Sequence, residues 1–263
     1  MADELAVLQC DPETLGQAIG TAALAVEGHD PRTEMFVRIR PEHIDTPASA
    51  VGAPLGSYCT FDGSLFEEFT VFESTAAVLP VGPALDWLEY FADDESLTVS
   101  VLGESGAEYA SALQFTNEAR TATLNCIEPT TVLDAVEITL PDRFEDGQYL
   151  DEDRNPLPTT AETSARELER LVAATERCQV DSYPLTLDGE LRFEVRGEHS
   201  TAAGTLAGSV EGPTVSHQFG PEFARIVRAI DGQVTLQTGP SQPLVVRCTD
   251  PGVTYRYVLT PED

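Results

Sequence analysis

The chain has 263 residues, of which 41% are hydrophobic, so it can bury one large core or two ordinary ones, and disorder is excluded. No apolar run approaches the ~18 residues that a membrane-spanning helix needs, and the acidic N-terminus is unlike a signal peptide, so we expect a cytoplasmic protein. The net charge is −30, from 45 acidic and 15 basic residues, and every basic residue is Arg.

The first half of the chain predicts a strand, a helix, four strands, a second helix and three further strands. Asp11 is a good N-cap for the first helix, and Glu13 lies near its start. The expected strands are Ala6–Cys10, Met35–Ile39, Tyr58–Phe61, Thr70–Phe72, Ala77–Val81, Leu97–Leu102, Glu108–Phe115 and Thr121–Ile127. The expected helices are Asp11–Gly28 and Gly82–Asp94.

The second half repeats this order. The expected strands are Thr159–Thr163, Tyr183–Leu187, Leu191–Arg196, Thr201–Val210, Val215–Phe219, Val234–Thr238, and a final hairpin of Pro243–Thr249 and Val253–Thr260. The expected helices are Ser164–Cys178, capped by Ser164, and Pro221–Asp231. PVGPALDWLEYFADDESLTVSV and QFGPEFARIVRAIDGQVTLQT share the order strand, Gly-Pro, helix, acidic turn, strand. This indicates an internal duplication with a period of about 140 residues.

We therefore predict an α+β fold of two similar domains, each rich in strands and carrying two short helices. The expected boundaries are 1–127 and 159–263, with a long connector at 128–158. The first part of the connector carries apolar side chains, and its second part is acidic and rich in turn residues.

Motifs for catalysis and metal binding are missing from the sequence. The five cysteines are far apart with no CxxC, and the four histidines lie in separate segments. There is no GxSxG, Walker loop or HExxH. Asp93-Asp94-Glu95 is more typical of a solvated turn than of a metal site. We expect no enzyme, no metal and no cofactor; a carboxylate-based hydrolase is the remaining enzymatic alternative.

The charge has two interpretations. An acidic decoy that mimics DNA would concentrate carboxylates on one surface. Adaptation to a cytoplasm of multimolar salt, where the Debye length is only ~3 Å, would spread them along the chain. The acidic residues are spread singly and Lys is absent, which favours the high-salt interpretation.

The outward faces of the two second-half helices carry one third of the arginines. They are Arg166, Arg170, Arg177, Arg225 and Arg228. Such a face predicts contact with phosphate; the alternative is a solvated face with Glu–Arg pairs such as Glu167–Arg170. The first-half helices show no Arg, and the second of them exposes Asp86 and Glu89.

The order of several segments resembles the sliding clamps of archaea and eukaryotes, the PCNA family. These segments are SLFEEF (Ser64–Phe69), GPEFARIVRAI, PLVV followed by a hairpin, and YVLTP near the end. The resemblance covers most of the chain and is strongest over residues 215–263. It implies a homotrimeric ring around double-stranded DNA, without sequence preference, in which helices line the hole and the five arginines face DNA. It also implies that edge strands near Glu108–Phe115 and Thr201–Val210 pair between subunits.

In the family, the connector and the C-terminal strand form a groove for short peptides of replication and repair proteins. By position, the resemblance places eight residues in it: Leu133, Val136, Ile138, Pro243, Val258, Leu259, Thr260 and Pro261. The implied partners are a DNA polymerase, a clamp loader, and a ligase or nuclease. The alternatives left open are that these residues belong to the core, and that the protein is a peptide-binding scaffold that does not encircle DNA.

Overall fold

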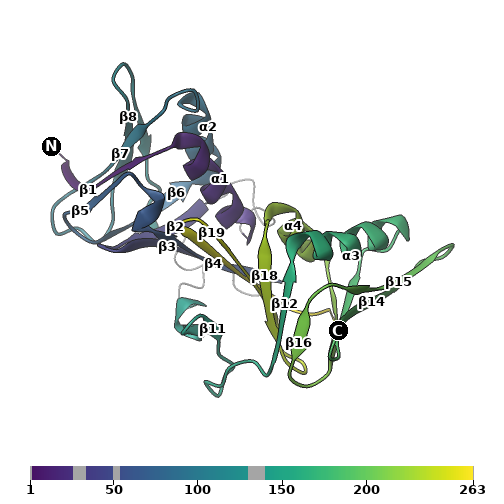
Figure 1. Cartoon of the computed structure of the whole chain (residues 1–263). Helices are drawn as coiled ribbons and strands as arrows, with labels where there is room; N and C mark the ends of the chain where they lie inside the picture. Colours follow the sequence, from purple (N-terminus) through teal and green to yellow (C-terminus); the bar gives the residue numbers. More distant parts are fainter. Residues whose placement is uncertain (1, 26–33, 50–53, 130–139, 263) are drawn as a thin grey trace. The chain divides into compact units, whose positions relative to one another are not determined.

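The computed structural model describes residues 2–25, 34–49, 54–129 and 140–262 (Figure 1). The chain divides into two compact units. Unit 1 comprises Met1–Val51, Ser57–Ile138 and Pro251–Thr254, and unit 2 comprises Gly52–Gly56, Thr139–Asp250 and Tyr255–Asp263. The expected domain boundaries stay a prediction, because residues 130–139 lie outside the described part.

Among its described residues, unit 1 contains two α-helices, two short 3-10 helices (Ala23–Ala25 and Gly63–Leu65), and nine strands that lie wholly or mostly in it. The α-helices and strands are β1 (Asp3–Cys10), α1 (Pro12–Ala22), β2 (Glu34–Ile39), β3 (His43–Ser49), β4 (Leu55–Asp62), β5 (Glu68–Val71), β6 (Thr75–Pro80), α2 (Val81–Tyr90), β7 (Leu97–Gly103), β8 (Ala112–Thr116) and β9 (Thr121–Asn125). The strands lie side by side in the orders β5-β1-β7-β8-β9 and β4-β3-β2-β6.

In unit 2 a short 3-10 helix (Leu140–Arg143) and a small hairpin, β10 (Phe144–Glu145) and β11 (Gln148–Tyr149), precede the main elements. These are β12 (Thr159–Ser164), α3 (Ala165–Arg177), β13 (Tyr183–Leu187), β14 (Leu191–Arg196), β15 (Thr201–Leu206), β16 (Ser209–Glu211), β17 (Val215–Phe219), α4 (Pro221–Ala229), β18 (Gln233–Thr238), β19 (Leu244–Asp250) and β20 (Val253–Leu259). Their strands run in the orders β16-β12-β18-β19-β20 and β15-β14-β13-β17.

The two units repeat one another strand for strand. Replacing β1 by β12, β2 by β13 and so on to β9 by β20 converts both strand orders of unit 1 into those of unit 2. The helices hold the same places, α1 and α3 after the first strand and α2 and α4 before the seventh. The predicted α+β fold of two similar strand-rich halves with short helices is confirmed.

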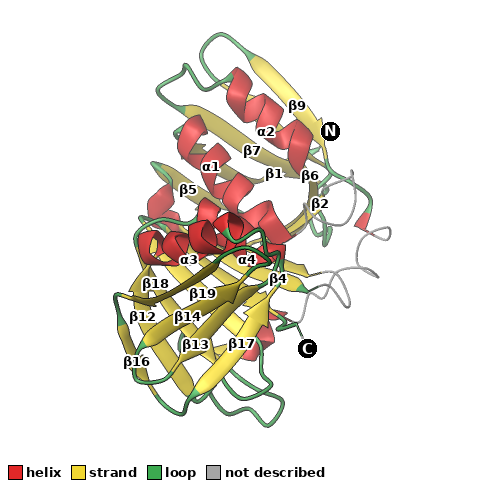
Figure 2. Ribbon diagram, turned by 90° about the vertical axis from the view of Figure 1, so that its right-hand side faces the viewer, coloured by secondary structure: helices red, strands yellow, loops and turns green. Residues whose placement is uncertain are grey.

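In each unit the two helices pack against one another (Figure 2). α1 starts at Asp11, whose carboxylate accepts the backbone N–H of Thr14 at 2.6 Å, and the Ser164 hydroxyl accepts that of Glu167 at 3.4 Å to start α3. α1 ends earlier than expected, at Ala22, and residues 26–28 lie outside the described part.

All five cysteines are free thiols, as expected from their spacing. Four are buried and Cys126 is half-buried. Burial, reinforced by the Asp11 carboxylate, raises the pKa of Cys10 to about 12, and burial raises that of Cys126 to about 11. These thiols therefore stay protonated at neutral pH. Within the described residues, the helices are too short or too polar to cross a membrane.

Candidate nucleic-acid interface

The outward face of α3 is built by helical spacing. Arg166, Arg170 and Arg177 are exposed, as the sequence predicts. The opposite face is buried and consists of Ala165, Leu168, Leu171, Val172 and Thr175. Because arginine stems can lie along the helix while the guanidinium stays in water, these three charges face solvent rather than the core.

On α4, Arg228 is exposed and Arg225 is half-buried. The helix follows Gly220-Pro221 and buries Phe223, Ala224, Ile226 and Val227. We call the outward sides of α3 and α4 together the arginine face, defined by Arg166, Arg170, Arg177, Arg225 and Arg228.

Glutamates lie among these arginines. Arg170 donates to the Glu167 carboxylate at 2.8 Å, and Arg228 forms an ion pair with Glu176, which ties α4 to α3. The Glu167 carboxylate also accepts a hydrogen bond from the backbone N–H of Ala207 at 2.9 Å. This hydrogen bond lowers the pKa of the Glu167 carboxyl most, and the Arg170 guanidinium lowers it further. The Glu–Arg pair named as the solvated alternative is therefore present. Exposed pairs of this kind contribute about 0–1 kcal/mol, so Arg170 and Arg228 can exchange a carboxylate for a phosphate at little cost.

The charge of the helices differs between the units. α3 and α4 carry five arginines and four glutamates, a net charge of +1. α1 and α2 carry no basic residue and three carboxylates, a net charge of −3. Asp86 and Glu89 are exposed as expected, beside Tyr90, which is 54% exposed. The arginine face is therefore the favourable surface for phosphate among the described helices.

One expected edge strand is wrong. Ala112–Thr116, which is β8, pairs with β7 on one side and β9 on the other, so it lies inside the sheet. The outer strand is β9, which follows a hairpin turn after β8. In unit 2 the expected segment Thr201–Val210 holds two strands, and β15 is at the end of its sheet, paired with β14.

The two edges share an unusual composition. Residues 121–127 and 201–210 contain no charged side chain, although 23% of the chain is charged. β9 exposes Thr121, Thr123 and Asn125, and β15 exposes Thr201, Ala203 and Thr205. Proteins usually protect free edges with charges, Pro or bulges, and an uncharged regular edge is typical of a strand that pairs with another chain.

No protein-family model matches the sequence, and no curated protein matches it. Solved structures do match. The PCNA of A. fulgidus, solved with the C-terminal region of FEN-1 bound, is 14% identical with a TM-score of 0.71, covering 98% of each chain. The PCNA of Entamoeba histolytica is 13% identical with a TM-score of 0.73, covering 99% of this chain and 100% of its own. The fold is that of the sliding clamps.

A bacterial relative of the sliding-clamp fold also matches. A putative DNA polymerase III beta subunit from Eubacterium rectale is 14% identical with a TM-score of 0.73; the match covers 100% of this chain and 66% of the bacterial chain. The resemblance to the PCNA family is therefore confirmed at the level of the sliding-clamp fold.

The expected peptide groove of the sliding-clamp fold is described only on its C-terminal side. Leu133, Val136 and Ile138 lie outside the described residues. β20 alternates, with Leu259 buried at 2% exposure and Val258 half-buried on the other side. Leu259 thus packs inside the protein, as the core alternative foresaw. Pro243 and Pro261 are half-buried and Thr260 is exposed, so these residues and Val258 offer accessible surface.

Arg120, which sequence reasoning did not single out, anchors the turn before β9. Its guanidinium donates to the Tyr90 carbonyl at 3.2 Å, forms an ion pair with Asp94, and lies 4.8 Å from the Tyr90 ring centre and 5.0 Å from that of Phe91. The Asn117 side chain accepts its backbone N–H at 2.6 Å. Arg120 therefore joins the β8–β9 turn to the C-terminal end of α2 and sets the course of the edge strand.

Replacing Arg120 by Ala is expected to lower the free energy of unfolding by about 1–3 kcal/mol, because an ion pair, a hydrogen bond and ring contacts are lost together. Urea denaturation at fixed salt measures this. Arg196→Ala is the control, since Arg196 pairs with Glu194 at an exposed site, and we expect a loss below about 1 kcal/mol. Equal losses in the two variants would show that Arg120 is no anchor.

Proposed function

We propose that the chain is a DNA sliding clamp: three copies close into a ring around duplex DNA and hold replication and repair enzymes on it. The observation that carries the proposal is the sliding-clamp fold over nearly the whole chain, with the same eleven elements in each unit. A clamp acts through topology, because its DNA contacts are to the phosphate backbone and carry no base information. It needs no catalytic group.

Ring closure would use the two uncharged edges. β9 belongs to unit 1 and β15 to unit 2, so pairing β9 of one copy with β15 of the next is a head-to-tail contact. Such contacts form a closed ring when the rotation between copies closes, and every edge is then covered. This assignment uses β9 in place of the strand first expected.

The arginine face would line the ring and meet phosphate. In multimolar salt such contacts are weak, since affinity falls with a log–log slope of about −0.9 per phosphate contact. A topological link holds in any salt, which suits a clamp in the salty cytoplasm that the composition favours. The acidic faces of α1 and α2 would leave DNA centred mainly by unit 2.

Partner enzymes would dock at the C-terminal groove through short peptides. The support is the position of Val258, Thr260, Pro243 and Pro261 beside the end of β20, and the A. fulgidus relative, which was solved with a FEN-1 segment bound. The end of the chain is held there, since the Glu262 N–H donates to the Gln218 carbonyl at 2.8 Å. A polymerase, a clamp loader, a ligase or a nuclease are the classes of partner expected.

Light scattering after gel filtration, in multimolar KCl and in dilute buffer, tests the ring. We expect a particle of three times 28.4 kDa in high salt. Retention of this particle on nicked circular duplex, and its loss when the circle is linearised, is the expected sign of a topological link. A single chain under both conditions that still binds a partner peptide would instead support the scaffold that does not encircle DNA.

A further inference from the structure

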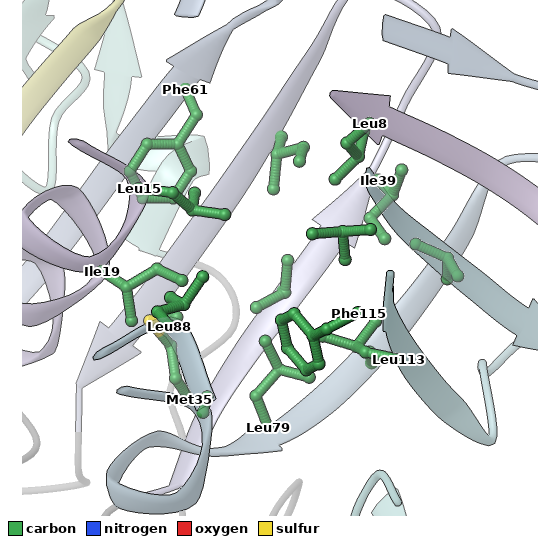
Figure 3. Close-up of a pocket in the computed structure, with 16 residues that line it drawn as sticks. Leu8, Leu15, Ile19, Met35, Ile39, Phe61, Leu79, Leu88, Leu113 and Phe115 are labelled. Atoms are coloured by element: carbon green, nitrogen blue, oxygen red, sulfur yellow. The ribbon is translucent and has the colours of Figure 1, made fainter. Parts of the chain in front are cut away.

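The core of unit 1 contains an apolar cavity of about 50 Å³ (Figure 3). All sixteen residues that line it are apolar and buried: Leu8, Leu15, Ile19, Met35, Val37, Ile39, Ile44, Phe61, Ala77, Leu79, Ala84, Leu88, Val99, Val101, Leu113 and Phe115. Figure 3 shows Leu15, Ile19 and Leu88 of the two helices on one side of the space, together with Phe61 and Met35, and shows Leu8, Ile39, Leu113 and Phe115 of the strands on the other.

The repeat between the units shows where the space comes from. In unit 1, Met35 of β2 pairs with Leu79 of β6. In the matching pair of strands of unit 2, Tyr183 of β13 pairs with Phe219 of β17. Both strands hold the same places in both sheets, so unit 2 has a pair of aromatic side chains on the strands that carry Met35 and Leu79 in unit 1.

The next helix repeats the difference. α2 buries Val81, Ala84 and Leu88, whereas α4 buries Phe223, Ala224, Ile226 and Val227. In unit 2 the Phe223 ring lies 5.7 Å from the Phe219 ring and 5.8 Å from the Tyr183 ring. Unit 2 thus packs three aromatic rings from two strands and a helix whose counterparts in unit 1 carry Met35, Leu79 and Ala84.

The cavity should be dry. Water in a protein interior needs two to four polar partners, and this lining supplies only carbon atoms and the Met35 thioether. The lining atoms lack contacts on the side of the void, so a guest of matching size would gain dispersion contacts without displacing bound water.

We propose that this cavity is a binding site for one small apolar molecule, of the size of xenon or a hydrocarbon of a few carbons. The polar groups of the chain take no part, and binding depends on shape and polarizability. The proposal concerns the interior of unit 1 and does not rest on ring formation or DNA binding.

Methionine-methyl NMR of the full chain under xenon tests the proposal. The chain has two methionines, Met1 and Met35, and Met35 lines the cavity. With ¹³C-methyl methionine we expect the Met35 signal to shift with xenon pressure and to saturate, while free methionine added to the sample serves as the reference for solvent effects. A Met35 signal that does not shift, or that follows free methionine without saturating, would overturn the proposal.

Cavity-filling variants give the second arm. Ala84→Leu should abolish the saturating shift, and Ala84→Phe should do the same with a larger side chain, because Ala84 lines the cavity. Ala92→Leu adds the same atoms at an exposed position at the end of α2 and should leave the shift unchanged. If a folded Ala84→Leu variant kept the full Met35 shift, xenon would bind elsewhere. That result would overturn the proposed site even if the wild-type signal shifts and saturates.

Discussion

Replacing Thr123 by Glu is expected to shift the proposed three-subunit particle towards single chains of 28.4 kDa in light scattering. Thr123 is exposed in the middle of β9, opposite Gln114 of β8, so the substitution brings no new charge next to an acidic neighbour within the sheet. In a ring, the new carboxylate would stay on the solvent face of the joined sheet but lose part of its hydration beside β15, where residues 201–210 offer no charged partner. A polar group that loses hydration without gaining a partner costs about 1–3 kcal/mol, which is a loss of roughly five- to hundredfold in association at each contact.

The effect should persist in multimolar salt. Salt screens charges that are separated in solvent, but it does not remove the desolvation of a carboxylate at a closed interface. Thr70→Glu is the control for added charge, because Thr70 lies in β5, the opposite edge of the same sheet. Since the Thr70 hydroxyl donates to Glu68 at 3.4 Å, urea denaturation of this variant checks that the new carboxylate leaves it folded. Ala203→Arg in β15 should weaken the same contact from the β15 side. Within the subunit, Glu194 of β14 lies opposite residue 203 and can pair with the new guanidinium, so the β14–β15 hairpin should stay intact. A threefold mass for Thr123→Glu, or dissociation by Thr70→Glu, would contradict the β9–β15 contact.

The elements that sequence patterns predicted well are those with local signals. α3 has a Ser cap and an apolar stripe, and both were read correctly. The strands of the final hairpin begin and end within one residue of expectation, and Gly252 between them has the positive φ of 77° that the turn requires. The duplication was also visible, because the Gly-Pro helix start appears in both halves.

The misses have physical causes. β3 was not predicted, because Pro47 lies within HIDTPAS and Pro normally argues against a strand. β8 was predicted to be an edge strand because alternation of apolar and polar residues does not reveal how many neighbouring strands a strand has. The number of neighbours depends on pairing between residues that are distant in the sequence. Burial of Leu259 was equally invisible, since adjacent positions in a strand point to opposite sides and the sequence does not say which side is the core.

Replacing Arg166 and Arg170 by Gln is expected to reduce the salt dependence of duplex binding by about 1.8 log units per log unit of salt, at about 0.9 for each lost phosphate contact. Both residues are exposed on α3 and line the same open hollow near Gly208, so one DNA strand can reach both. Gln has nearly the helix propensity of Arg, and the Arg228–Glu176 pair that joins α3 to α4 is left in place. The loss should be the same for every DNA sequence, because phosphates carry no base information.

Fluorescence anisotropy of a labelled duplex over a salt series measures this slope. Arg192→Gln with Arg196→Gln is the matched control: both arginines are exposed on β14, each is ion-paired, and the variant changes the net charge by the same amount. If DNA senses only the total charge, both variants weaken binding equally, and the arginine face has no special role. If the α3 variant alone lowers the slope, the phosphates lie along that face. An unchanged slope in both, with partner-peptide binding intact, would leave the non-encircling scaffold as the better description, since a scaffold has no use for arginines there.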